Sequence, residues 1–438
     1  MNNDTLTRRQ KFFDQMLDNS VAIFFAAPEQ VRSNDTHYPY RQNSDFWYLT
    51  EFNEPESVLV LIKENDKHCK TIIFNRTKDV TAEIWTGIRL GQENALKALN
   101  VDEAYPFDQI TTELPTILSR KEALYHAFEL YSYADNVIKE VMHSLRNGLR
   151  LNLRAPHGVI DWRPMLHEMR LFKSEHEITL MRKAGKISAL GHIRAMQTCR
   201  PNMYEYQLEA EILHEFAKHG ARHPSYNTIV GGGNNGCILH YENNDQPLHN
   251  GDLVLIDAGC EYNYYAGDIT RTFPINGKFT EPQRAIYSIV LESQKQAIKL
   301  FKPGVSIKQV NDEVIKIMVT GLVKFGIMHG NIDELIKNKA INDFYMHGLG
   351  HWLGIDVHDV GDYKSIGRER MLEPGMVITV EPGIYINKNA NVPEQFKGIG
   401  IRIEDNIVIT ENGNEVLTSD APKEIADIEQ LMSANHKA

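Results

Sequence analysis

Apolar residues recur along the chain in short runs that predict a mixed α/β fold. Between about residue 20 and residue 170, runs such as SVAIFF (20–25), SVLVLI (57–62) and KTIIFN (70–75) alternate with helical patterns, for instance the one that follows Thr81. Runs of this length bounded by turn residues are typical of strands. Their alternation with helices predicts an α/β domain in this half of the chain.

A second domain is expected after the stretch LNLRAPHGVIDWRP, residues 151–164, whose prolines and glycine are typical of a linker. The length of 438 residues exceeds what one hydrophobic core organises, and the apolar fraction of 42% is sufficient to fill two cores. We therefore expect an N-terminal domain over residues 1–172 and a C-terminal domain over residues 173–438.

The C-terminal domain begins with a helical pattern that occurs twice. One long helix is expected to extend to Cys199, and a second helix to end at Gly220. The capping boxes that begin helices in the two copies start at Ser174, Thr280 and Ser306. When PNMYEYQLEAEI is aligned with PGVSIKQVNDEV, a proline, a glutamine and a glutamate coincide. This repetition predicts a duplicated helix-helix-strand unit with an active site between its halves.

The remaining apolar runs predict strands, and four of these runs contain a carboxylate. They are LVLIDAG with Asp257, YYAGDITRTF with Asp268, MVITVEPGIYI with Glu381 and GIGIRIEDNIVIT with Glu404. Burying a carboxylate costs free energy unless the group is paired, hydrogen-bonded or bound to a cation. A solvated rim would explain one such acid, but four in one domain predict a common cationic partner.

The first two of these runs are expected to form a hairpin. A turn at Tyr262-Asn263, where asparagine suits the positive φ, would place Asp257 directly opposite Asp268. Two carboxylates about 5 Å apart across a ladder repel each other, and a divalent cation between them would remove that penalty. The alternative for this pair is that one aspartate pairs with Arg271 or caps a turn.

Side-chain alternation separates the acids of the last run. A period of two places Glu404 on the same face as Arg402, whereas Asp405 points to the opposite face and is expected to be structural. Glu381 closes its own strand, because the Pro382-Gly383 pair that follows breaks the ladder.

The segment HGLGHWLGIDVHD (347–359) contains three histidines, but it does not predict a helical zinc site. Its glycines oppose a helix, and no glutamate follows His347 as the H-E-x-x-H motif requires, although His351 has the right spacing. Glycines beside histidines instead allow the backbone to approach a crowded site closely. One histidine from this segment would complete a set of four carboxylates and one imidazole.

Such a ligand set favours two metal ions. Four carboxylates, two divalent cations and a hydroxide leave the cluster near a charge of about −1, whereas one cation leaves about −2 buried. Oxygen ligands with one nitrogen suit manganese, cobalt or iron, and zinc less selectively. Two metal ions roughly 3.5 to 4 Å apart generate a hydroxide at neutral pH and polarise a carbonyl, which is the equipment for hydrolysis.

Composition excludes several other classes of function. The 58 acidic residues outnumber the 47 basic ones, the net charge is −11, and no basic block occurs, so nucleic acid is not an expected partner. The sequence contains no run of about eighteen apolar residues, the length that would predict a membrane span. The polar N-terminal segment also lacks the apolar core of a secretory signal. A cytoplasmic protein is therefore expected, and its cysteines, which show no C-x-x-C spacing, are expected to be reduced core thiols.

These motifs, in this order, resemble those of a known family. Asp257 and Asp268 with HGLGHWLGIDVHD, VITVEPG and GIRIEDNIVIT are similar to the metal-binding motifs of the pita-bread metallopeptidases, and CILHY (237–241) makes the chain most similar to the aminopeptidase P family. PYRQNSDFWYLTEFNEPES is also similar, with Glu51 where a glycine is expected. The resemblance covers essentially the whole chain, and it implies a creatinase-like N-terminal α/β domain followed by a pita-bread catalytic domain.

The resemblance also implies a ligand set for two divalent metal ions, most often Mn²⁺. Asp257 would bind one metal ion, His351 and Glu381 would bind the other, and Asp268 and Glu404 would bridge the two.

Further roles follow from the same resemblance. Glu381 would accept the proton of the attacking water, and His240 and His358 would stabilise the tetrahedral intermediate and transfer protons. His347 would line a proline pocket, and Arg402 would hold the substrate or neighbouring side chains. The alternative for each histidine is an ordinary buried hydrogen bond, and for Arg402 it is screening of Glu404.

The implied function is removal of the first residue from peptides with proline second, by a cytoplasmic dimer or tetramer. A prolidase that takes Xaa-Pro dipeptides would share all five ligands. A methionine aminopeptidase is disfavoured because its simplest forms lack the large N-terminal domain. A metal-free, creatinase-like hydrolase is disfavoured because it does not require the four carboxylates to be kept together. A pita-bread module that only binds peptides or proteins is disfavoured because it would be free to lose ligands, and all five are present. Trp85 matches a position where a neighbouring subunit approaches the active site in the family, although the sequence alone favours an ordinary packed tryptophan.

Overall fold

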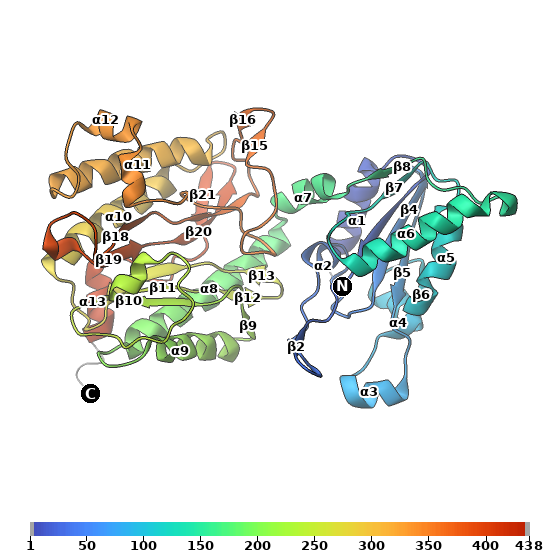
Figure 1. Ribbon diagram of the computed structural model, residues 1–438, viewed down its shortest axis with the longest axis horizontal. Helices are drawn as coiled ribbons and strands as arrows, with labels where there is room; N and C mark the ends of the chain where they lie inside the picture. Colours follow the sequence, from blue (N-terminus) through green and yellow to red (C-terminus); the bar gives the residue numbers. More distant parts are fainter. Residues whose placement is uncertain (1–3, 434–438) are drawn as a thin grey trace. The chain divides into compact units, whose positions relative to one another are not determined.

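The computed structural model describes residues 4–433, which divide into two compact units, one up to Arg170 and one from Leu171 onward (Figure 1). The expected boundary stood between residues 172 and 173. Each unit has its own buried apolar cluster and contains both helices and strands, which confirms the expected α/β fold class. Within residues 4–433, no helix is long and apolar enough to cross a membrane.

The N-terminal unit contains a six-stranded sheet in the order β6-β5-β4-β1-β7-β8. Its strands are β1 (Ser20–Phe25), β4 (Val58–Asn65), β5 (His68–Asn75), β6 (Glu103–Pro106), β7 (Ala123–Tyr125) and β8 (Gly158–Ile160). All side chains of β1 are buried, since β1 lies in the middle of the sheet with helices on its faces. The three apolar runs that predicted strands are therefore strands of one sheet.

The linker predicted over residues 151–164 is wrong in part. Within it, β8 pairs with β7 in parallel and belongs to the sheet of the N-terminal unit. Helix α7 (Arg163–Leu171) follows it directly. A strand of three residues offers too few side chains to show an apolar period, so the flanking proline and glycine dominated the pattern.

Two helices cover one face of this sheet. The apolar sides of α5 (Ile110–Leu118) and α6 (Ser132–Asn147) share a buried cluster with alternate residues of β1 and β4. The other helices of this unit are α1 (Asp4–Gln15), α2 (Ser44–Thr50), α3 (Val80–Thr86) and α4 (Gly91–Ala98).

Two residues of this unit have informative conformations. Glu51 ends α2 with φ +50°, a left-handed conformation that glycine adopts most easily, which accounts physically for the glycine expected at this position. Trp85 on α3 is 84% exposed, so the expectation of an ordinary packed tryptophan is wrong.

The C-terminal unit contains two pairs of long helices. They are α8 (Glu175–Thr198) with α9 (Glu205–Lys218), and α10 (Glu281–Leu300) with α11 (Ile307–Lys324). The three predicted capping boxes are present at Ser174, Thr280 and Ser306. In Figure 1 one pair lies on either side of the central strands, as expected for a duplicated unit.

The central strands form small sheets that meet between the helix pairs. They are β10 (Ile229–Gly232), β11 (Leu253–Asp257) and β14 (Thr270–Pro274); β17 (Val377–Val380), β20 (Asp405–Thr410) and β21 (Gly413–Val416); and β18 (Gly383–Ile386) with β19 (Ile399–Arg402). A short sheet contains β9 (His223–Pro224), β12 (Cys260–Tyr262) and β13 (Tyr265–Ala266). Helix α13 (Ile425–Ser433) ends the described chain.

The predicted hairpin forms, but its register differs by two residues. Its turn is Asn263-Tyr264, both at positive φ, so that Asp257 pairs with Thr270 and lies diagonal to Asp268 instead of directly opposite. The error arose because the turn was predicted one residue too early. A shift of two residues preserves the side-chain face, and the two carboxylates still lie on the same side.

The two acidic runs near the C-terminus are not continuous strands. The first is interrupted between β17 and β18 at Glu381, and the second between β19 and β20 at Glu404. The pairing on both sides of the interruption keeps one register, which places Glu381 opposite Glu404. Acidic residues therefore occupy the points at which regular pairing stops.

Candidate metal centre

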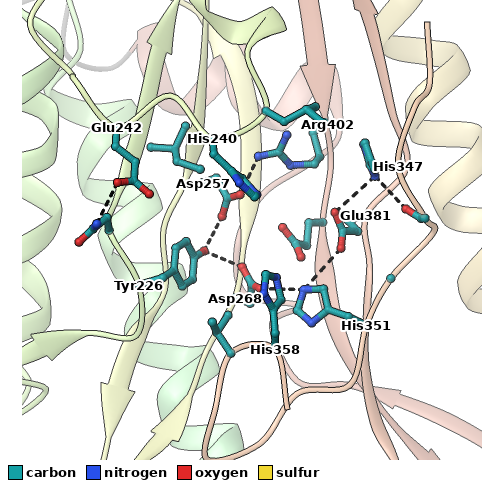
Figure 2. A pocket seen from close by; sticks show the side chains of 17 residues that line it. Tyr226, His240, Glu242, Asp257, Asp268, His347, His351, His358, Glu381 and Arg402 are labelled. Atoms are coloured by element: carbon teal, nitrogen blue, oxygen red, sulfur yellow. Dashed lines mark hydrogen bonds and ion pairs between the residues drawn. The ribbon is translucent and has the colours of Figure 1, made fainter. Parts of the chain in front are cut away.

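A cavity of about 500 Å³ in the C-terminal unit collects the predicted site residues. Figure 2 shows side chains from both halves of the unit that point into it. The lining includes every residue predicted to bind metal, to catalyse or to bind substrate: His240, Asp257, Asp268, His347, His351, His358, Glu381, Arg402 and Glu404. These residues span more than 160 positions of sequence, and the interrupted strands bring them together.

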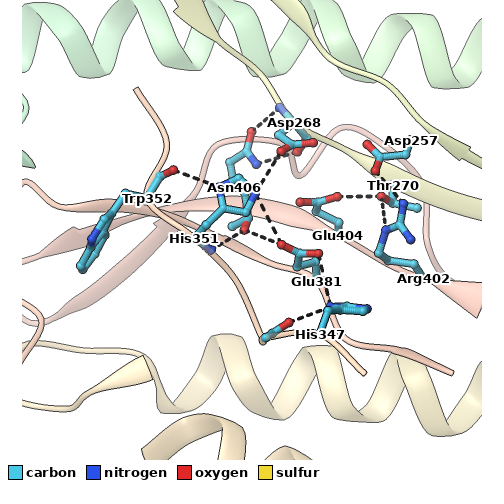
Figure 3. A network of polar contacts seen from close by, with 12 residues as sticks. Asp257, Asp268, Thr270, His347, His351, Trp352, Glu381, Arg402, Glu404 and Asn406 are labelled. Carbon is cyan, nitrogen blue, oxygen red and sulfur yellow. Dashed lines mark hydrogen bonds and ion pairs between the residues drawn. The ribbon is translucent and has the colours of Figure 1, made fainter. Parts of the chain in front are cut away.

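Asp268, His351 and Glu404 form the core of the cluster, since each offers a ligand atom and these atoms lie within 4.8 Å of one another. Nε2 of His351 lies 3.4 Å from Asp268 and 3.5 Å from Glu381. Nδ1 of the same ring donates to the carbonyl of Trp352 at 2.9 Å, which leaves Nε2 free to bind a metal ion (Figure 3). A histidine oriented through its second nitrogen is typical of metal sites.

The segment that carries His351 is irregular and not helical, as predicted. Gly350 allows it to lie directly on β17, because a Cβ atom there would be 2.0 Å from the carbonyl oxygen of Thr379. The backbones of His351 and Thr379 are hydrogen-bonded at 3.0 Å. The expectation that glycine permits close approach is thus confirmed at this position.

The clustered charges change the pKa values of the group. Burial, together with the neighbouring carboxylates Asp268 and Glu381, raises the pKa of Glu404 well above its ordinary value. Burial raises the pKa of Glu381 to about 7, against the opposing charges of His351 and Arg402. For His351, contact with Asp268 outweighs burial and raises the pKa to about 9. Without a cation, this cluster therefore retains protons.

Tyr226 was not predicted and lies against two carboxylates of the acidic group. Its hydroxyl contacts carboxylate oxygens of both Asp257 and Asp268, at 2.5 Å for the second (Figure 2). No sequence pattern pointed to Tyr226, because it precedes a strand and contacts the two aspartates only once β10 has paired with β11.

Arg402 links the acidic group to a tyrosine and a histidine. Its guanidinium donates to Asp257 at 2.6 Å and to the hydroxyl of Tyr385 at 2.9 Å. Tyr385, a second residue that sequence reasoning missed, also contacts Nε2 of His347 at 2.8 Å. Burial and the positive charge of Arg402 lower the pKa of His347 to about 4, so this imidazole is neutral. The suggestion that Arg402 screens Glu404 is incomplete, since its direct ion pair is with Asp257.

Thr270 links two parts of this network. Its hydroxyl donates to Glu404 at 2.6 Å and accepts from Nε of Arg402 at 3.0 Å (Figure 3). Thr270 also pairs with Asp257 in the ladder between β11 and β14. Thr270 therefore orients the Glu404 carboxylate and the Arg402 guanidinium from a fixed position in the sheet.

His240 and His358 complete the lining of the cavity. The ring of His358 lies edge-on against that of His351, with centroids 4.4 Å apart. Partial burial and the charge of His351 lower the pKa of His358, which favours its neutral form. His240 lies on a separate loop and lines the same cavity (Figure 2).

Asp405 is structural, as predicted. It is fully buried on the opposite side of its strand and contacts Arg271 at 2.7 Å and Lys423 at 2.6 Å. These two cations overcome burial and lower the pKa of Asp405 to about 2. The alternative in which Arg271 pairs with Asp257 or Asp268 is therefore wrong.

The donor set fits divalent metal ions. It consists of four carboxylates and one imidazole whose second nitrogen is already oriented, and hard cations prefer oxygen ligands with few nitrogens. Burial, with a contribution from the neighbouring carboxylates, raises the pKa values of Glu381 and Glu404, and bound cations would offset both effects.

Comparison with known proteins agrees with this geometry. Residues 179–411 match the family described as "Metallopeptidase family M24", and residues 6–125 match "Aminopeptidase P, N-terminal domain". An Xaa-Pro aminopeptidase of Escherichia coli is 60% identical over 98% of this chain and 97% of its own length. This chain belongs to the aminopeptidase P group of metallopeptidase family M24.

Solved structures of aminopeptidase P share the fold throughout. Proline aminopeptidase P II from Yersinia pestis is 60% identical, with a TM-score of 0.98 over 99% of this chain and 100% of that one. A zinc-substituted aminopeptidase P of Escherichia coli in complex with product is 59% identical, with a TM-score of 0.98 over 99% of this chain and 98% of that one. The creatinase-like N-terminal domain and the pita-bread catalytic domain are thereby confirmed.

Proposed function

We propose that this chain is a metal-dependent aminopeptidase that removes the first residue from peptides with proline in second position. One observation carries the proposal: four carboxylates and an imidazole from distant segments line one cavity, in a chain 60% identical to an Xaa-Pro aminopeptidase over nearly its full length.

The cofactor in this proposal is a pair of divalent ions, Mn²⁺ in the first instance. Asp257 would hold one ion, His351 and Glu381 the other, and Asp268 and Glu404 both. When bound, two such ions polarise a carbonyl and lower the pKa of a water molecule, which is the chemistry that amide hydrolysis requires. The near-neutral charge of four carboxylates with two divalent ions supports the number two.

Three side chains would manage protons and charge in the reaction. Glu381 would take the proton of the attacking water, and the two histidines His240 and His358 would hydrogen-bond the oxyanion and return the proton to the leaving nitrogen. Their support is position, since all three line the cavity next to the ligand set.

Two further residues would bind the substrate. The proline nitrogen has no N–H and holds φ near about −65°, so a proline-specific site must recognise the ring itself and cannot rely on strand pairing. His347, which is neutral and fixed by Tyr385, would offer a face to that ring. Arg402 would act mainly by orienting Asp257.

The proposal is tested by release of the first residue from matched peptides. Metal-stripped protein is assayed before and after addition of Mn²⁺, with Xaa-Pro, Xaa-Pro-Xaa and Xaa-Ala-Xaa that share the same first residue. We expect Mn²⁺-dependent cleavage of the proline tripeptide at least as fast as that of the dipeptide, and little cleavage of the alanine peptide.

Each of the other outcomes would identify a different function. Cleavage confined to the dipeptide would identify a prolidase, and preference for a peptide beginning with methionine would identify a methionine aminopeptidase. No cleavage with bound metal would favour a binding-only module. Titration of the apoprotein with Mn²⁺ would give a stoichiometry of two, and a stoichiometry of one would refute the dinuclear site.

The same proposal includes assembly into a dimer or tetramer through the N-terminal unit. Val80, Ile84, Trp85 and Ile88 on and beside α3 are each at least 77% exposed. Four large apolar side chains gathered on one short segment are uncommon on a monomer's surface. We propose that a second copy of this chain covers this α3 cluster.

A cytoplasmic location belongs to the proposal as well. It is supported by the four free cysteines, of which Cys199 and Cys260 are buried and Cys69 and Cys237 partly exposed. The expectation that all four are core thiols is therefore wrong for two of them. Fractionation of the source cells with an antibody to the chain would test the location.

A further inference from the structure

His240 and His358 are exposed side chains on irregular segments, and each is followed by a buried residue. Tyr241 follows His240, and Asp359 follows His358. An exposed imidazole on an irregular segment has several accessible positions, whereas a group that hydrogen-bonds a transition state must be held in one. The buried neighbours are therefore the residues through which the fold can hold these histidines in place.

The Tyr241 side leads to Glu205, the first residue of α9, which is 0% exposed. One carboxylate oxygen of Glu205 accepts from the Tyr241 hydroxyl at 2.8 Å and from the backbone N–H of Gln246 at 2.9 Å. The other oxygen accepts from the backbone N–H of Gly232 at 2.8 Å and from the Asn235 amide at 3.0 Å. Glu205 thus fastens the chain before, beside and after His240.

This carboxylate is unusual because its contacts are hydrogen-bond donors and not a cation. Among residues 4–433, no lysine, arginine or histidine forms an ion pair with Glu205. Four donors around one buried carboxylate give short, directional bonds that a neutral side chain could not all accept. A glutamine has one acceptor oxygen, and its N–H₂ group would face donors.

The Asp359 side leads to a buried ion pair. Nζ of Lys173 lies 3.0 Å from Asp359, and the two side chains are each 1% exposed. The backbone N–H of Asp359 donates to the carbonyl of Trp352 at 2.9 Å, which closes the loop that contains His358. Gly354 permits this closure, since a Cβ atom there would be 2.1 Å from the Asp359 carboxylate.

We propose that Glu205 and the Lys173–Asp359 pair are positioning residues that hold His240 and His358, respectively, at the reacting carbonyl. The proposal rests on the proposed aminopeptidase function. Neither group lines the cavity, so each acts through the histidine next to its contact. Displacement of a catalytic group by about 1 Å costs up to about 100-fold in rate, which sets the scale of the effect.

The first test is Glu205→Gln, with Glu211→Gln as the matched control. Glu211 lies on the same helix and pairs with Arg194 at 2.7 Å on the surface, away from the loop. We expect Glu205→Gln to lower kcat by about 10- to 100-fold with KM within about threefold, and the control to leave both unchanged. Tyr241→Phe, which removes one hydroxyl, serves if Glu205→Gln fails to fold, and it should lower kcat in the same direction.

The second test applies the same logic to His358. Because removal of one partner leaves a buried charge, the variant is the double substitution Lys173→Met with Asp359→Asn. The matched control is Lys308→Met with Asp312→Asn, an exposed pair on α11. We expect kcat to fall for the first double variant alone.

A double-mutant cycle separates positioning from general destabilisation. If Glu205 acts through His240, the substitution Glu205→Gln has no further effect on kcat once His240→Ala is present, and the same holds for Lys173–Asp359 in the His358→Ala background. Losses that multiply in the combined variants, or an unchanged kcat in the single ones, would overturn the proposal.

A readout without turnover keeps this result distinct from the proposed function. In protein labelled with ¹⁵N at histidine, the imidazole signals of His240 should shift or broaden in Glu205→Gln, and those of His358 should not. Unchanged His240 signals would overturn the positioning role even in an active enzyme. An inactive wild-type protein whose His240 signals still depend on Glu205 would refute the aminopeptidase function and not the contact.

Discussion

Glu404 and Asp405 are neighbours in sequence with opposite electrostatic surroundings. Glu404 faces Glu381 and lies within reach of Asp268, whereas Asp405 contacts two cations, Arg271 and Lys423. Both carboxylates are buried. The same chemical change, from carboxylate to amide, must therefore have opposite effects on the stability of the metal-free protein.

The substitution Glu404→Gln is expected to stabilise the metal-free protein while it abolishes turnover. In the metal-free fold, burial and the neighbouring carboxylates keep Glu404 protonated at a cost in free energy that a neutral amide avoids, and we expect a rise of about 1 kcal/mol or more in the free energy of unfolding with EDTA present. Mn²⁺-dependent activity should fall by more than about 100-fold, since a ligand is lost. Urea unfolding and the peptide assay, each with EDTA and with Mn²⁺, measure the two effects.

Asp405→Asn is the matched comparison. It leaves Arg271 and Lys423 with less compensation in the interior, and we expect about 3 kcal/mol of destabilisation with or without metal. A loss of stability in metal-free Glu404→Gln equal to that of Asp405→Asn would mean that Glu404 is a structural acid.

The pH dependence of the metal-free protein follows from His351 and Glu381. The pKa of His351 is raised from 6.5 to about 9, so protonated His351 stabilises the fold below about pH 6.5 and this contribution is lost as pH rises to about 9. The pKa of Glu381 is raised from 4.5 to about 7, so its ionisation in the folded state costs stability above about pH 4.5. Both effects have the same sign.

We therefore expect the melting temperature of the EDTA-treated protein to fall between pH 5 and pH 9, and the increase produced by Mn²⁺ to grow over the same range. Metal binding needs neutral His351 and ionised carboxylates, and higher pH supplies both. Thermal unfolding at constant ionic strength gives the two curves. A metal-induced increase that is constant with pH would exclude His351 as a ligand.

At this scale the sequence predicted the charged residues of the site and missed the aromatic ones. A carboxylate in an apolar run is costly and therefore conspicuous, as for Asp268 and Glu381. Tyr226 and Tyr385 are amphipathic, fit any half-buried strand, and acquire their contacts only through tertiary pairing.

Two of the acidic ligands, Glu381 and Glu404, lie at positions where the strands are interrupted. Strands β17 and β18, and likewise β19 and β20, keep a common register across a gap, and an acid stands at each gap. A continuous ladder would direct alternate side chains to opposite faces, whereas a gap frees one residue from the ladder. Period-two counting through GIRIEDNIV thus found the correct face for Asp405 but could not find the interruption.

The hairpin shows a similar limit. The turn type was predictable from asparagine, but Tyr264 also adopts positive φ, which is uncommon for an aromatic residue, and this moved the register by two residues. The capping boxes of the helices, in contrast, are local, and they were found where predicted.

Contact between two elements makes Gly350→Ala a test of the His351 segment. Its Cβ atom would meet the carbonyl oxygen of Thr379 at 2.0 Å, and backbone cannot move aside as a side chain can. We expect about 2 to 3 kcal/mol of destabilisation and weaker binding of Mn²⁺, because His351 is displaced.

Gly348→Ala is the control from the same motif, since beyond the adjacent residues its Cβ atom would lie no closer than 4.0 Å to any atom, and its φ is not positive. Isothermal titration with Mn²⁺ and thermal unfolding of the two variants give the comparison. Equal losses in both would show that the segment tolerates no side chain at all, and that contact with β17 is not the cause.

At the scale of the whole molecule, the structure of a single chain does not explain why the apolar side chains of the α3 cluster are exposed. Helix α3 contains both apolar and polar residues, yet none of them is buried. The resemblance named Trp85 as a subunit contact, and sequence patterning could not decide the matter, because exposure depends on what lies opposite the helix. The exposed fraction of 84% in the single chain leaves Trp85 available to a second copy.

Substitution of Trp85 by glutamate is expected to lower the mass of the particle in solution to that of one chain, 50.1 kDa. A charge at the centre of an apolar interface disrupts it, whereas an exposed side chain contributes little to the stability of its own chain. Light scattering during gel filtration measures the mass, and an unchanged melting temperature at high dilution shows that the fold is intact. Leu151→Glu, which alters a single apolar side chain 77% exposed outside the cluster, is the control. If the wild-type chain is already monomeric, or if both variants keep the wild-type mass, the α3 cluster is not where copies of this chain meet.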